Sequence, residues 1–491
     1  MHQGSLCILA SLAIVIFLGL VPRSGASAEL RCVDDEGAAH RVDDAATSLA
    51  SSFARAGLPG AAAVLVHNEE LSFVSFGRDS EGKPISADTH FYGGSLSKAF
   101  TAAAVLQLAE NGLVDLDAPV KNYVPEFRTR DPRATEITVR QLLNHTSGLT
   151  NATYREWRLP QPIDLETAVA RLSSAAMIAP GESFNYHNPN YAVLARLVEK
   201  VSGQEFGVYL RERIFVPLGM TNTSTVDHVD EARDGAAKGH IRLFGRFFPI
   251  SSPKFFVNGA GGVLTTPRDY SIWLLAQRRE GEGPNGFRVL SAESVQASHT
   301  PGPKAGEYGF GWNRRGRRVG HGGGLPNHAA FAALEGCNAI AVFAPVVPVA
   351  APLREIALSG LAAMANQPAE LPASSDRLWL DLALAVVSLA VLAYAIRSAS
   401  LAPRWAAARR GRSLGRVALS FLPQIAAIVL ILIVLPWAAS KVISWSWIWF
   451  AFYFPMVVVA LAAAVIASAV VALARIVALW SVANAESRRG H

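Results

Sequence analysis

The sequence predicts an α+β protein with an apolar C-terminal region, on the strength of three observations. Short apolar segments typical of β-strands lie near both ends of the stretch that ends at residue 365. The stretch between them contains the amphipathic runs of helices. Three further apolar segments follow, each near the ~20 residues that span a bilayer. We therefore expect an antiparallel sheet flanked by helices, an inserted helical lobe, and a membrane region of three helices.

The first element is an apolar run at residues 6–21, followed by Ala26-Ser27-Ala28. An apolar run before small residues is typical of a secretory signal peptide, so we predict a signal peptide over residues 1–28. The segment before the run has no Lys or Arg, which keeps an uncleaved anchor open as an alternative. After cleavage Cys32 and Cys337 remain, and either a disulfide or two separate thiols fits an exported protein.

Residues 29–366 form the predicted outer domain, with predicted strands near both of its ends. Residues 60–68 and 71–77 are apolar segments joined by a short turn, which predicts a hairpin. Three more short strands are predicted late in the domain, at residues 318–322, 328–335 and 339–345. Amphipathic runs such as Tyr191–Ser202 predict helices in the middle, and a last helix is expected at residues 353–365.

The segment Ser95-Leu96-Ser97-Lys98 carries the most specific chemical signal. A serine and a lysine three apart at a helix N-terminus lie on one face, so the Lys98 amine can take the proton of the Ser95 hydroxyl. The N–H groups of a helix N-terminus also suit the oxyanion that forms in acyl transfer. These features predict a nucleophilic serine, Ser95, activated by Lys98. The plainer interpretation is a helix cap followed by a surface lysine.

The same Ser-x-x-Lys spacing occurs at two other places in the chain. Ser80 and Lys83 lie in a segment with turn chemistry, and a proline between Ser251 and Lys254 disfavours a helix there. Because only Ser95 precedes a long run of good helix formers, we favour Ser95 as the nucleophile.

A second motif is Tyr186-His187-Asn188, followed by Pro189. A phenol beside a lysine can carry a proton between nucleophile and leaving group, and an amide can hold a substrate carbonyl. An Asn-Pro pair is also typical of an ordinary turn. The rival segment Ser183-Phe184-Asn185 could fill the same place, but we favour Tyr186.

A third motif, His321-Gly322-Gly323-Gly324, lies where a strand is predicted. Glycines there let a substrate backbone approach closely and leave an N–H group to face an oxyanion. The alternative is a glycine loop that happens to contain a histidine. Lys304-Ala305-Gly306 is a competing segment, but the prolines beside it indicate a loop.

In this order the three motifs resemble those of the serine β-lactamase and penicillin-binding-protein family. That family combines Ser-x-x-Lys, Tyr-x-Asn or Ser-x-Asn, and a Lys-Thr-Gly-type strand motif. The chain is most similar to the class C-like branch, with its related esterases and D-amino-acid peptidases. Further matching segments are Leu142–Leu149, Gly259–Asp269 and Tyr308–Trp312. The resemblance covers about residues 45–365.

The resemblance implies a β-lactamase/transpeptidase-like sheet with a helical lobe and Ser95 as the nucleophile. Lys98 and Tyr186 would be the proton carriers, and Asn188 would contact the substrate. The backbone N–H groups of Ser95 and Gly324 would form the oxyanion hole.

His321, Gly322 and Gly323 stand where the family often has Lys-Thr-Gly, and they would contact the substrate. The lysine charge and the threonine hydroxyl that hold a substrate carboxylate are absent, so we expect a peptidase or esterase rather than a true β-lactamase. An unperturbed histidine titrates near pH ~6.5, so His321 is expected to hold anionic substrates better at acid pH. The contrary hypothesis makes His321 a neutral hydrogen-bond donor.

The apolar C-terminal segments are Leu378–Ile396, Val417–Ala439 and Trp447–Ala469. They predict a linker at 367–377, a three-helix transmembrane region at 378–480 and a cytoplasmic tail at 481–491. Six arginines lie between the first two segments and three follow the third. The positive-inside rule then places these arginines in the cytoplasm and residues 29–376 outside.

The net charge of +6 follows the same division, because residues 377–491 carry +9 and the remainder carries −3. The excess positive charge therefore lies in the predicted membrane region, where it is explained by the positive-inside rule, and no nucleic-acid partner is expected. The twelve histidines do not cluster at zinc-ligand spacings, and neither a metal nor a cofactor is predicted. The expected partners are a small-molecule or peptide substrate and the lipid bilayer.

The sequence thus predicts a serine hydrolase that acts through a Ser95 acyl-enzyme on an amide or ester, such as a D-amino-acid or cell-wall peptide. It would be a multi-pass protein of a bacterial inner membrane with its catalytic domain outside. No Gly-x-Ser-x-Gly elbow surrounds Ser95, which argues against an α/β-hydrolase. A true β-lactamase and a non-enzymatic penicillin-binding or cell-wall sensor are the alternatives. Inner loops of only about 20 residues leave no room for an output domain, which favours the enzyme.

Overall fold

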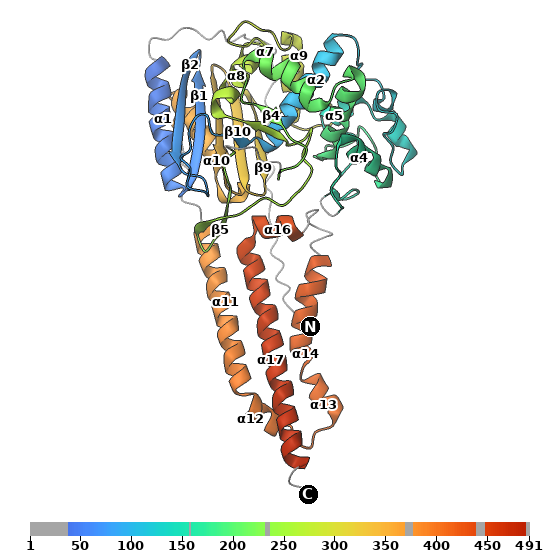
Figure 1. Ribbon diagram of the computed structural model, residues 1–491, viewed down its shortest axis with the longest axis vertical. Coiled ribbons are helices and arrows are strands. Elements are labelled where there is room, and N and C mark those ends of the chain that lie inside the picture. Colours follow the sequence, from blue (N-terminus) through green and yellow to red (C-terminus); the bar gives the residue numbers. More distant parts are fainter. Residues whose placement is uncertain (1–37, 157–158, 231–235, 369–376, 438–446, 488–491) are drawn as a thin grey trace, which may run out of the picture.

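The computed structural model describes residues 38–156, 159–230, 236–368, 377–437 and 447–487. The predicted signal peptide, Cys32 and most of the predicted linker lie outside the described residues. Cys337 is disulfide-bonded. Figure 1 shows a mixed body of strands and helices above a bundle of long helices.

A six-stranded antiparallel sheet forms the centre of the body, in the order β2-β1-β11-β10-β9-β8. Its strands are β1 (Gly60–His67), β2 (Glu70–Gly77), β8 (Asn313–Arg315), β9 (Arg318–Leu325), β10 (His328–Glu335) and β11 (Asn338–Ala344). The predicted hairpin and the predicted late strands are therefore confirmed. They join in one sheet because β1 pairs with β11, where Val64 lies opposite Ala341.

Strand β9 differs from its prediction because it continues through the glycines to Leu325 instead of ending at Gly322. Glycine is a weak strand former, and this is why the pattern predicts an earlier end. In the structure, backbone pairing with β10 carries the strand on, with Gly323 opposite Ala330.

Helices cover both faces of the sheet, which explains why β1 is buried along its whole length. Helices α1 (Ala38–Arg55) and α10 (Leu353–Met364) pack on one face, where Leu49 and Ile356 meet Leu65. On the other face, Val64 and Val66 pack in a core with Phe100 of α2 (Ser97–Glu110) and Trp273 of α8 (Pro267–Arg278). Alternate residues of β1 thus enter two cores.

The inserted lobe is helical, as predicted, and lies to one side of the sheet in Figure 1. Its helices are α3 (Val139–Leu143), α4 (Leu165–Ala170), α5 (Pro189–Ser202), α6 (Phe206–Leu210) and α7 (Val216–Leu218), and α9 (Ala292–His299) follows later. Two small sheets complete the body, from β3 (Phe91–Tyr92), β7 (Val263–Thr265) and β4 (Ser224–Thr225), and from β5 (His240–Leu243) and β6 (Arg246–Pro249).

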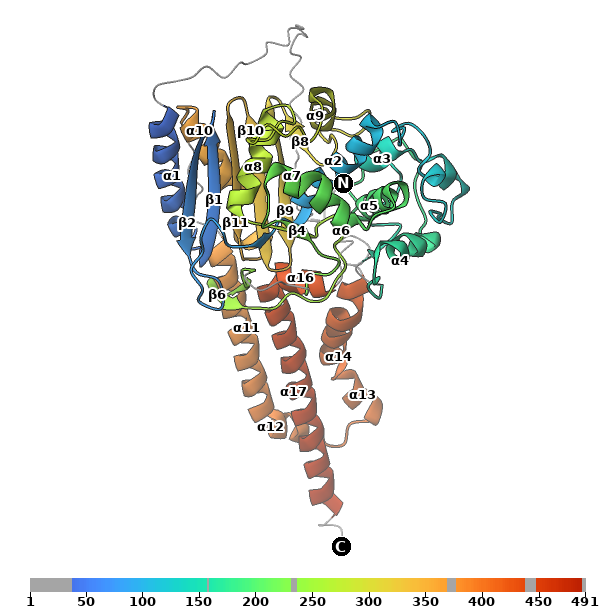
Figure 2. The same ribbon diagram turned by 45° about the horizontal axis from the view of Figure 1, so that its top comes forward.

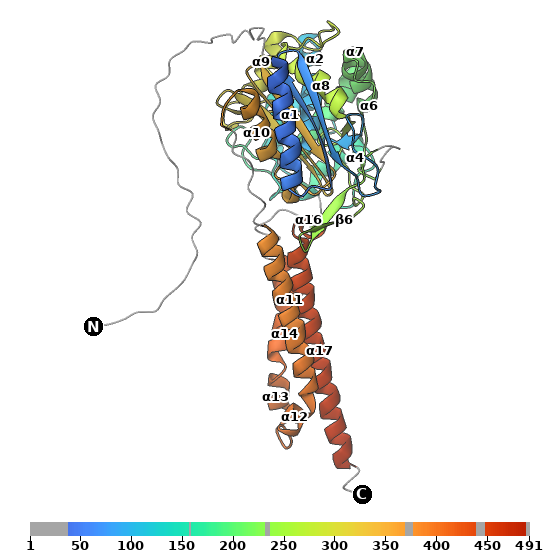
Figure 3. The same ribbon diagram turned by 90° about the vertical axis from the view of Figure 1, so that its left-hand side faces the viewer.

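The C-terminal region consists of apolar helices that run away from the body in Figures 1 and 3. They are α11 (Arg377–Ser400), α12 (Ala402–Ala407), α13 (Leu414–Leu419), α14 (Leu422–Val429), α16 (Trp447–Tyr453) and α17 (Pro455–Ser487). Among the described residues, two helices are long and apolar enough to cross a membrane, Trp379–Ser400 and Pro455–Ala485. The apolar helix Leu422–Trp437 is shorter.

The predicted segment Trp447–Ala469 is divided in the structure into α16 and the start of α17. Pro455 is the first residue of α17, a position that proline tolerates because its missing N–H group needs no partner there. The middle predicted segment runs past residue 437 and out of the described residues, so three spans stay a prediction.

The β5–β6 hairpin joins the body to the helical bundle (Figure 2). Its Arg242 Nε lies 3.7 Å from Asp381 Oδ2 of α11, and the Gly245 N–H donates to the same carboxylate at 3.2 Å. The Phe244 N–H lies 3.4 Å from the sulfur of Met456 in α17. Two helices of the bundle therefore contact one hairpin of the body.

Candidate active site

The predicted nucleophile lies on a tight turn that leads into a buried helix. Ser95 is the middle residue of a 3₁₀ turn, Gly94–Leu96, which continues directly into α2. Gly94 has a φ of 53°. A Cβ atom there would lie 2.6 Å from the backbone nitrogen of Gly324 in β9, so only glycine allows the turn to meet that strand.

Two predicted proton carriers converge on the Ser95 hydroxyl. Lys98 Nζ lies 3.1 Å from Ser95 Oγ, one helical turn along α2. The Tyr186 hydroxyl donates to the same Oγ at 2.7 Å. The structure therefore brings together three groups from two segments about 90 residues apart in sequence.

The Lys98 side chain is fully buried, and this changes its acidity. Its Nζ also lies 2.9 Å from Asn188 Oδ1 and 2.8 Å from the Ala260 carbonyl oxygen. Burial lowers the pKa of the Lys98 amine to about 7, against the opposing effect of the Glu156 negative charge. A large fraction of the amine is therefore neutral near neutral pH.

The partners of Lys98 orient the neutral amine as a base. A neutral amine has two N–H donors and one lone pair, while the Asn188 and Ala260 oxygens can only accept. Both N–H groups are thus used there, and the lone pair faces Ser95 Oγ. Ser95 in turn accepts from Tyr186, so its own proton is directed to Lys98.

Tyr186 remains a phenol in this environment, because burial raises its pKa well above the ordinary value. Its ring lies 4.4 Å from that of His145, centre to centre. His145 Nδ1 accepts from Asn190 Nδ2 at 2.9 Å and from the His187 N–H at 3.3 Å. Because Nδ1 accepts both bonds, the His145 imidazole is neutral and carries its proton on Nε2. The imidazole ring packs against the phenol ring of Tyr186.

His321 lies in β9 beside the pocket and is only 6% exposed. Its Nδ1 donates to the Gly322 carbonyl oxygen at 2.7 Å, and its Nε2 accepts from the Tyr308 hydroxyl at 3.2 Å. Burial, and then the positive charge of Lys98, lower the pKa of His321 to about 4. The expectation that His321 gains charge across ordinary pH is therefore wrong, because burial keeps it neutral.

The three glycines after His321 have different surroundings. Gly322 and Gly324 line the pocket. Gly323, which the sequence predicts as a substrate contact, packs against the nucleophile turn: a Cβ there would lie 1.9 Å from the Gly93 carbonyl oxygen. Close approach of strand and turn requires glycine at this position.

The rival segments lie in other settings. Asn185 of the rival Ser-x-Asn motif turns back to Ser183, whose hydroxyl it contacts at 3.1 Å. Lys304 has a positive φ of 60° in a turn, as its flanking prolines predict. Ser251 is exposed in the loop that follows β6.

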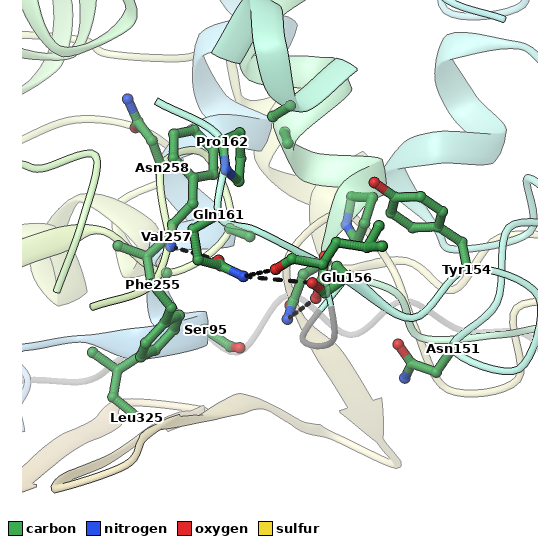
Figure 4. Close-up of a pocket in the computed structure, with 18 of the residues that line it drawn as sticks. Ser95, Asn151, Tyr154, Glu156, Gln161, Pro162, Phe255, Val257, Asn258 and Leu325 are labelled. Carbon is green, nitrogen blue, oxygen red and sulfur yellow. Dashed lines mark hydrogen bonds between the residues drawn. The ribbon is translucent and has the colours of Figure 1, made fainter. Parts of the chain in front are cut away.

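The pocket beside Ser95 has a volume of about 380 Å³, within the range of small-molecule sites. Figure 4 shows Phe255 and Leu325 on one side of Ser95, and Glu156 and Tyr154 on the other. Gln161 links these walls, since it accepts from the Phe256 N–H at 3.0 Å and donates to the Glu156 carbonyl oxygen at 3.5 Å.

Several residues of the site are not singled out by sequence reasoning. Glu156 accepts from Asn188 Nδ2 at 3.2 Å, and burial raises its pKa to about 7. Tyr308 and His145 lie inside matching segments but have no predicted role. Tyr453 of α16 also lines the pocket. No sequence signal marks Glu156 or Tyr453, because only the fold brings them to Ser95.

The described residues contain no group of three or more His, Cys, Asp or Glu side chains placed to hold a metal ion. The polar side chains around Ser95 carry hydroxyls, amides, an amine, a carboxyl, an imidazole and a guanidinium. This set is suited to proton transfer and acyl transfer.

Comparison with known proteins places this arrangement in a family. The sequence model of the family described as Beta-lactamase matches residues 39–381. The chain is 29% identical over 286 residues to Protein flp of Staphylococcus aureus (strain MRSA252), covering 56% of each protein. It is 28% identical over 254 residues to Penicillin-binding protein 4 of Amycolatopsis lactamdurans, covering 48% of this chain and 64% of that protein. The chain thus spans 56% and 64% of the length of these two curated relatives.

Solved structures show the same fold. The octameric penicillin-binding protein homologue from Pyrococcus abyssi matches with a TM-score of 0.57 and 24% identity, over 67% of this chain and 78% of that one. The D-amino acid amidase from Ochrobactrum anthropi SV3, complexed with L-phenylalanine, matches with a TM-score of 0.56 and 23% identity, over 66% and 98%.

Proposed function

The chain belongs to the Beta-lactamase family, and on that basis we propose that it is a serine hydrolase that forms an acyl-enzyme on Ser95. One observation carries the proposal: the buried Lys98 amine, with its pKa lowered to about 7, lies 3.1 Å from Ser95 Oγ. Its other two contacts are oxygens that only accept hydrogen bonds. A serine held in this way is an activated nucleophile.

In the proposed reaction, Lys98 Nζ takes the Ser95 proton while Oγ forms a bond to the substrate carbonyl carbon. The oxyanion is held by the N–H groups of Ser95 and Gly324, which the close packing of Gly94 on β9 supports. The bond to the leaving group breaks, and the Tyr186 phenol protonates that group. The proton on Lys98 then restores the phenol. Water releases the acyl group by the same steps in reverse order.

The surroundings of His321 favour substrates that place no carboxylate next to its ring. A neutral histidine supplies a hydrogen-bonding ring but no fixed positive charge, whereas a carboxylate is held best by a permanent cation. We therefore propose a peptidase or esterase acting on an amide or ester, rather than a true β-lactamase.

We further propose that the chain is a multi-pass membrane protein with residues 29–376 on the extracytoplasmic side. The two long apolar helices support membrane association. The arginines that follow α11 and those near the C-terminus support this orientation by the positive-inside rule.

The test of the proposed function is labelling of the full chain by a fluorophosphonate, together with turnover of 4-nitrophenyl acetate. We expect Ser95→Ala to abolish both. Ser251→Ala, which changes the serine of a rival Ser-x-x-Lys segment, is the matched control and is expected to keep both. Labelling that survives in Ser95→Ala and disappears in Ser251→Ala would reject the assignment.

A further inference from the structure

One wall of the active-site pocket comes from the C-terminal helical bundle. Tyr453, the last residue of α16, lines the same pocket as Ser95 and His321. A Cβ atom at Gly324 would lie 3.5 Å from the Tyr453 hydroxyl oxygen. Figure 1 shows α16 at the top of the bundle, against the underside of the body. The residue proposed to hold the oxyanion therefore lies next to the apolar helices.

The same side of the body carries exposed aromatic side chains on the β5–β6 hairpin, which contacts the bundle. Phe244 and Phe248 of the β5–β6 hairpin are 48% and 42% exposed, although both are large and apolar. The hairpin contacts Asp381 near the start of α11 and Met456 near the start of α17. Exposed apolar side chains grouped beside apolar helices are typical of a surface that contacts a membrane.

The pocket presents two large apolar side chains on one side of Ser95 and a carboxyl on the other. Phe255 and Leu325, on one side in Figure 4, are 4% and 3% exposed. Leu325 of β9 and Tyr453 of α16 both line this pocket. The other side presents the Glu156 carboxyl. Such a pocket fits a molecule with an apolar chain on one side of its scissile bond and a polar group on the other.

From these contacts we infer that the substrate is a membrane-resident amphiphile, a lipid-like molecule whose ester or amide carbonyl reaches Ser95 from the bilayer surface. Its apolar chain lies along Leu325 and Tyr453, and its polar group faces Glu156. This inference rests on the proposed function and adds the class of substrate. The covalent step is the one given above: the carbonyl carbon binds Ser95 Oγ, and the leaving group departs with a proton from Tyr186.

The inference is tested with the full chain in phosphatidylcholine vesicles and two esters, 4-nitrophenyl acetate and 4-nitrophenyl palmitate. The palmitate resides in the bilayer, so a site facing bulk water would hydrolyse it more slowly than the acetate. A site that opens at the bilayer surface is expected to favour the palmitate in kcat/KM by about tenfold or more, because the bilayer raises the effective concentration of this ester beside the site.

Variants of the pocket wall decide whether Tyr453 is responsible. Tyr453→Ala is expected to lower the ratio of palmitate to acetate kcat/KM at least about threefold, through loss of apolar contact. Tyr453→Phe keeps the ring and is expected to keep the ratio. Tyr394→Ala is the matched control, because Tyr394 lies on α11 and is 62% exposed.

Three outcomes would overturn the inference: a wild-type ratio at or below one, a ratio unchanged in Tyr453→Ala, or an equal fall in Tyr394→Ala. In each of these the acetate is still turned over and Ser95 is still labelled, so the proposed function stands. Absence of turnover of both esters, with no fluorophosphonate labelling of Ser95, would reject the proposed function and this inference with it.

Discussion

Replacing Lys98 by methionine is expected to stabilise the protein while it abolishes activity. The amine has a pKa of about 7 in the folded protein and 10.5 ordinarily, because burial disfavours its charged form. Each unit of that difference is worth about 1.4 kcal/mol, so keeping the amine buried at pH 7 costs about 4 kcal/mol. Methionine has a similar length and no charge. It loses three hydrogen bonds worth about 1 kcal/mol each, which leaves a net gain in the free energy of unfolding of about 1 kcal/mol.

The pH dependence of this gain is the sharper measurement. Between pH 7 and 10.5 the unfolded chain holds a proton that the folded chain lacks, so the free energy of unfolding of the wild type rises with pH across this window. The cost of burying Lys98 is largest below pH 7 and disappears above 10.5. The difference between Lys98→Met and wild type should therefore fall by about 2 kcal/mol from pH 7 to pH 9.

The assay is denaturant unfolding of both proteins in detergent, followed by the fluorescence of the buried Trp273 and Trp312 at pH 7 and 9. The comparison between variant and wild type cancels the titrating groups that do not interact with Lys98. A difference that stays constant between the two pH values would show that the Lys98 amine has an ordinary pKa, and the argument for Lys98 as the base would fail.

Three further results are expected. The kcat/KM of a neutral ester should rise through an acid limb near pH 7 set by Lys98. In Glu156→Gln, which removes the pocket carboxyl whose pKa is also about 7, a matched anionic ester should give the same profile as the neutral one, since burial keeps His321 neutral above pH 4; an advantage of the anionic ester at acid pH in this variant would contradict a neutral His321. Tyr308→Phe removes the hydroxyl that donates to His321 Nε2 and should lower kcat/KM about threefold to tenfold, with little effect on Tm; unchanged kinetics would show that this bond does not position the ring. Gly94→Ala should reduce fluorophosphonate labelling at least about 100-fold, because the added methyl group would meet the Gly324 nitrogen and the φ of this residue is positive. Gly112 also has a positive φ but has open space around it, so Gly112→Ala should retain labelling. Equal labelling of the two variants would refute the packing argument.

Local patterns in the sequence predicted those parts of the site that depend on one segment. The Ser95–Lys98 spacing follows from helix geometry, and the strands follow from short apolar runs bounded by turns. The order of the three motifs then gave the family. The end of β9 was predicted too early, because glycine is a weak strand former. These glycines are needed where the strand packs against the turn at Gly94, and this contact exists only in the folded protein.

Features that depend on the fold could not be predicted in this way. The charge of His321 depends on its burial and on the nearby Lys98 amine. Neither its burial nor this distance can be predicted from a local sequence pattern. Glu156 is a single acidic residue in a loop, and its contact with Asn188 exists only after folding. The segment Trp447–Ala469 was predicted as one helix because hydropathy averaged over a long window does not detect a single proline. Pro455 indicates the start of a new helix, and the structure begins α17 there.

The central claim is that Ser95 carries the acyl group, and trapping that intermediate tests it most directly. The full chain is mixed with 4-nitrophenyl acetate, quenched in acid within the first turnover, digested and analysed by mass spectrometry. We predict an acetyl group on the peptide that contains Ser95, and no acetylated peptide in Ser95→Ala. An acetyl group on a peptide without Ser95, retained in Ser95→Ala, would contradict it.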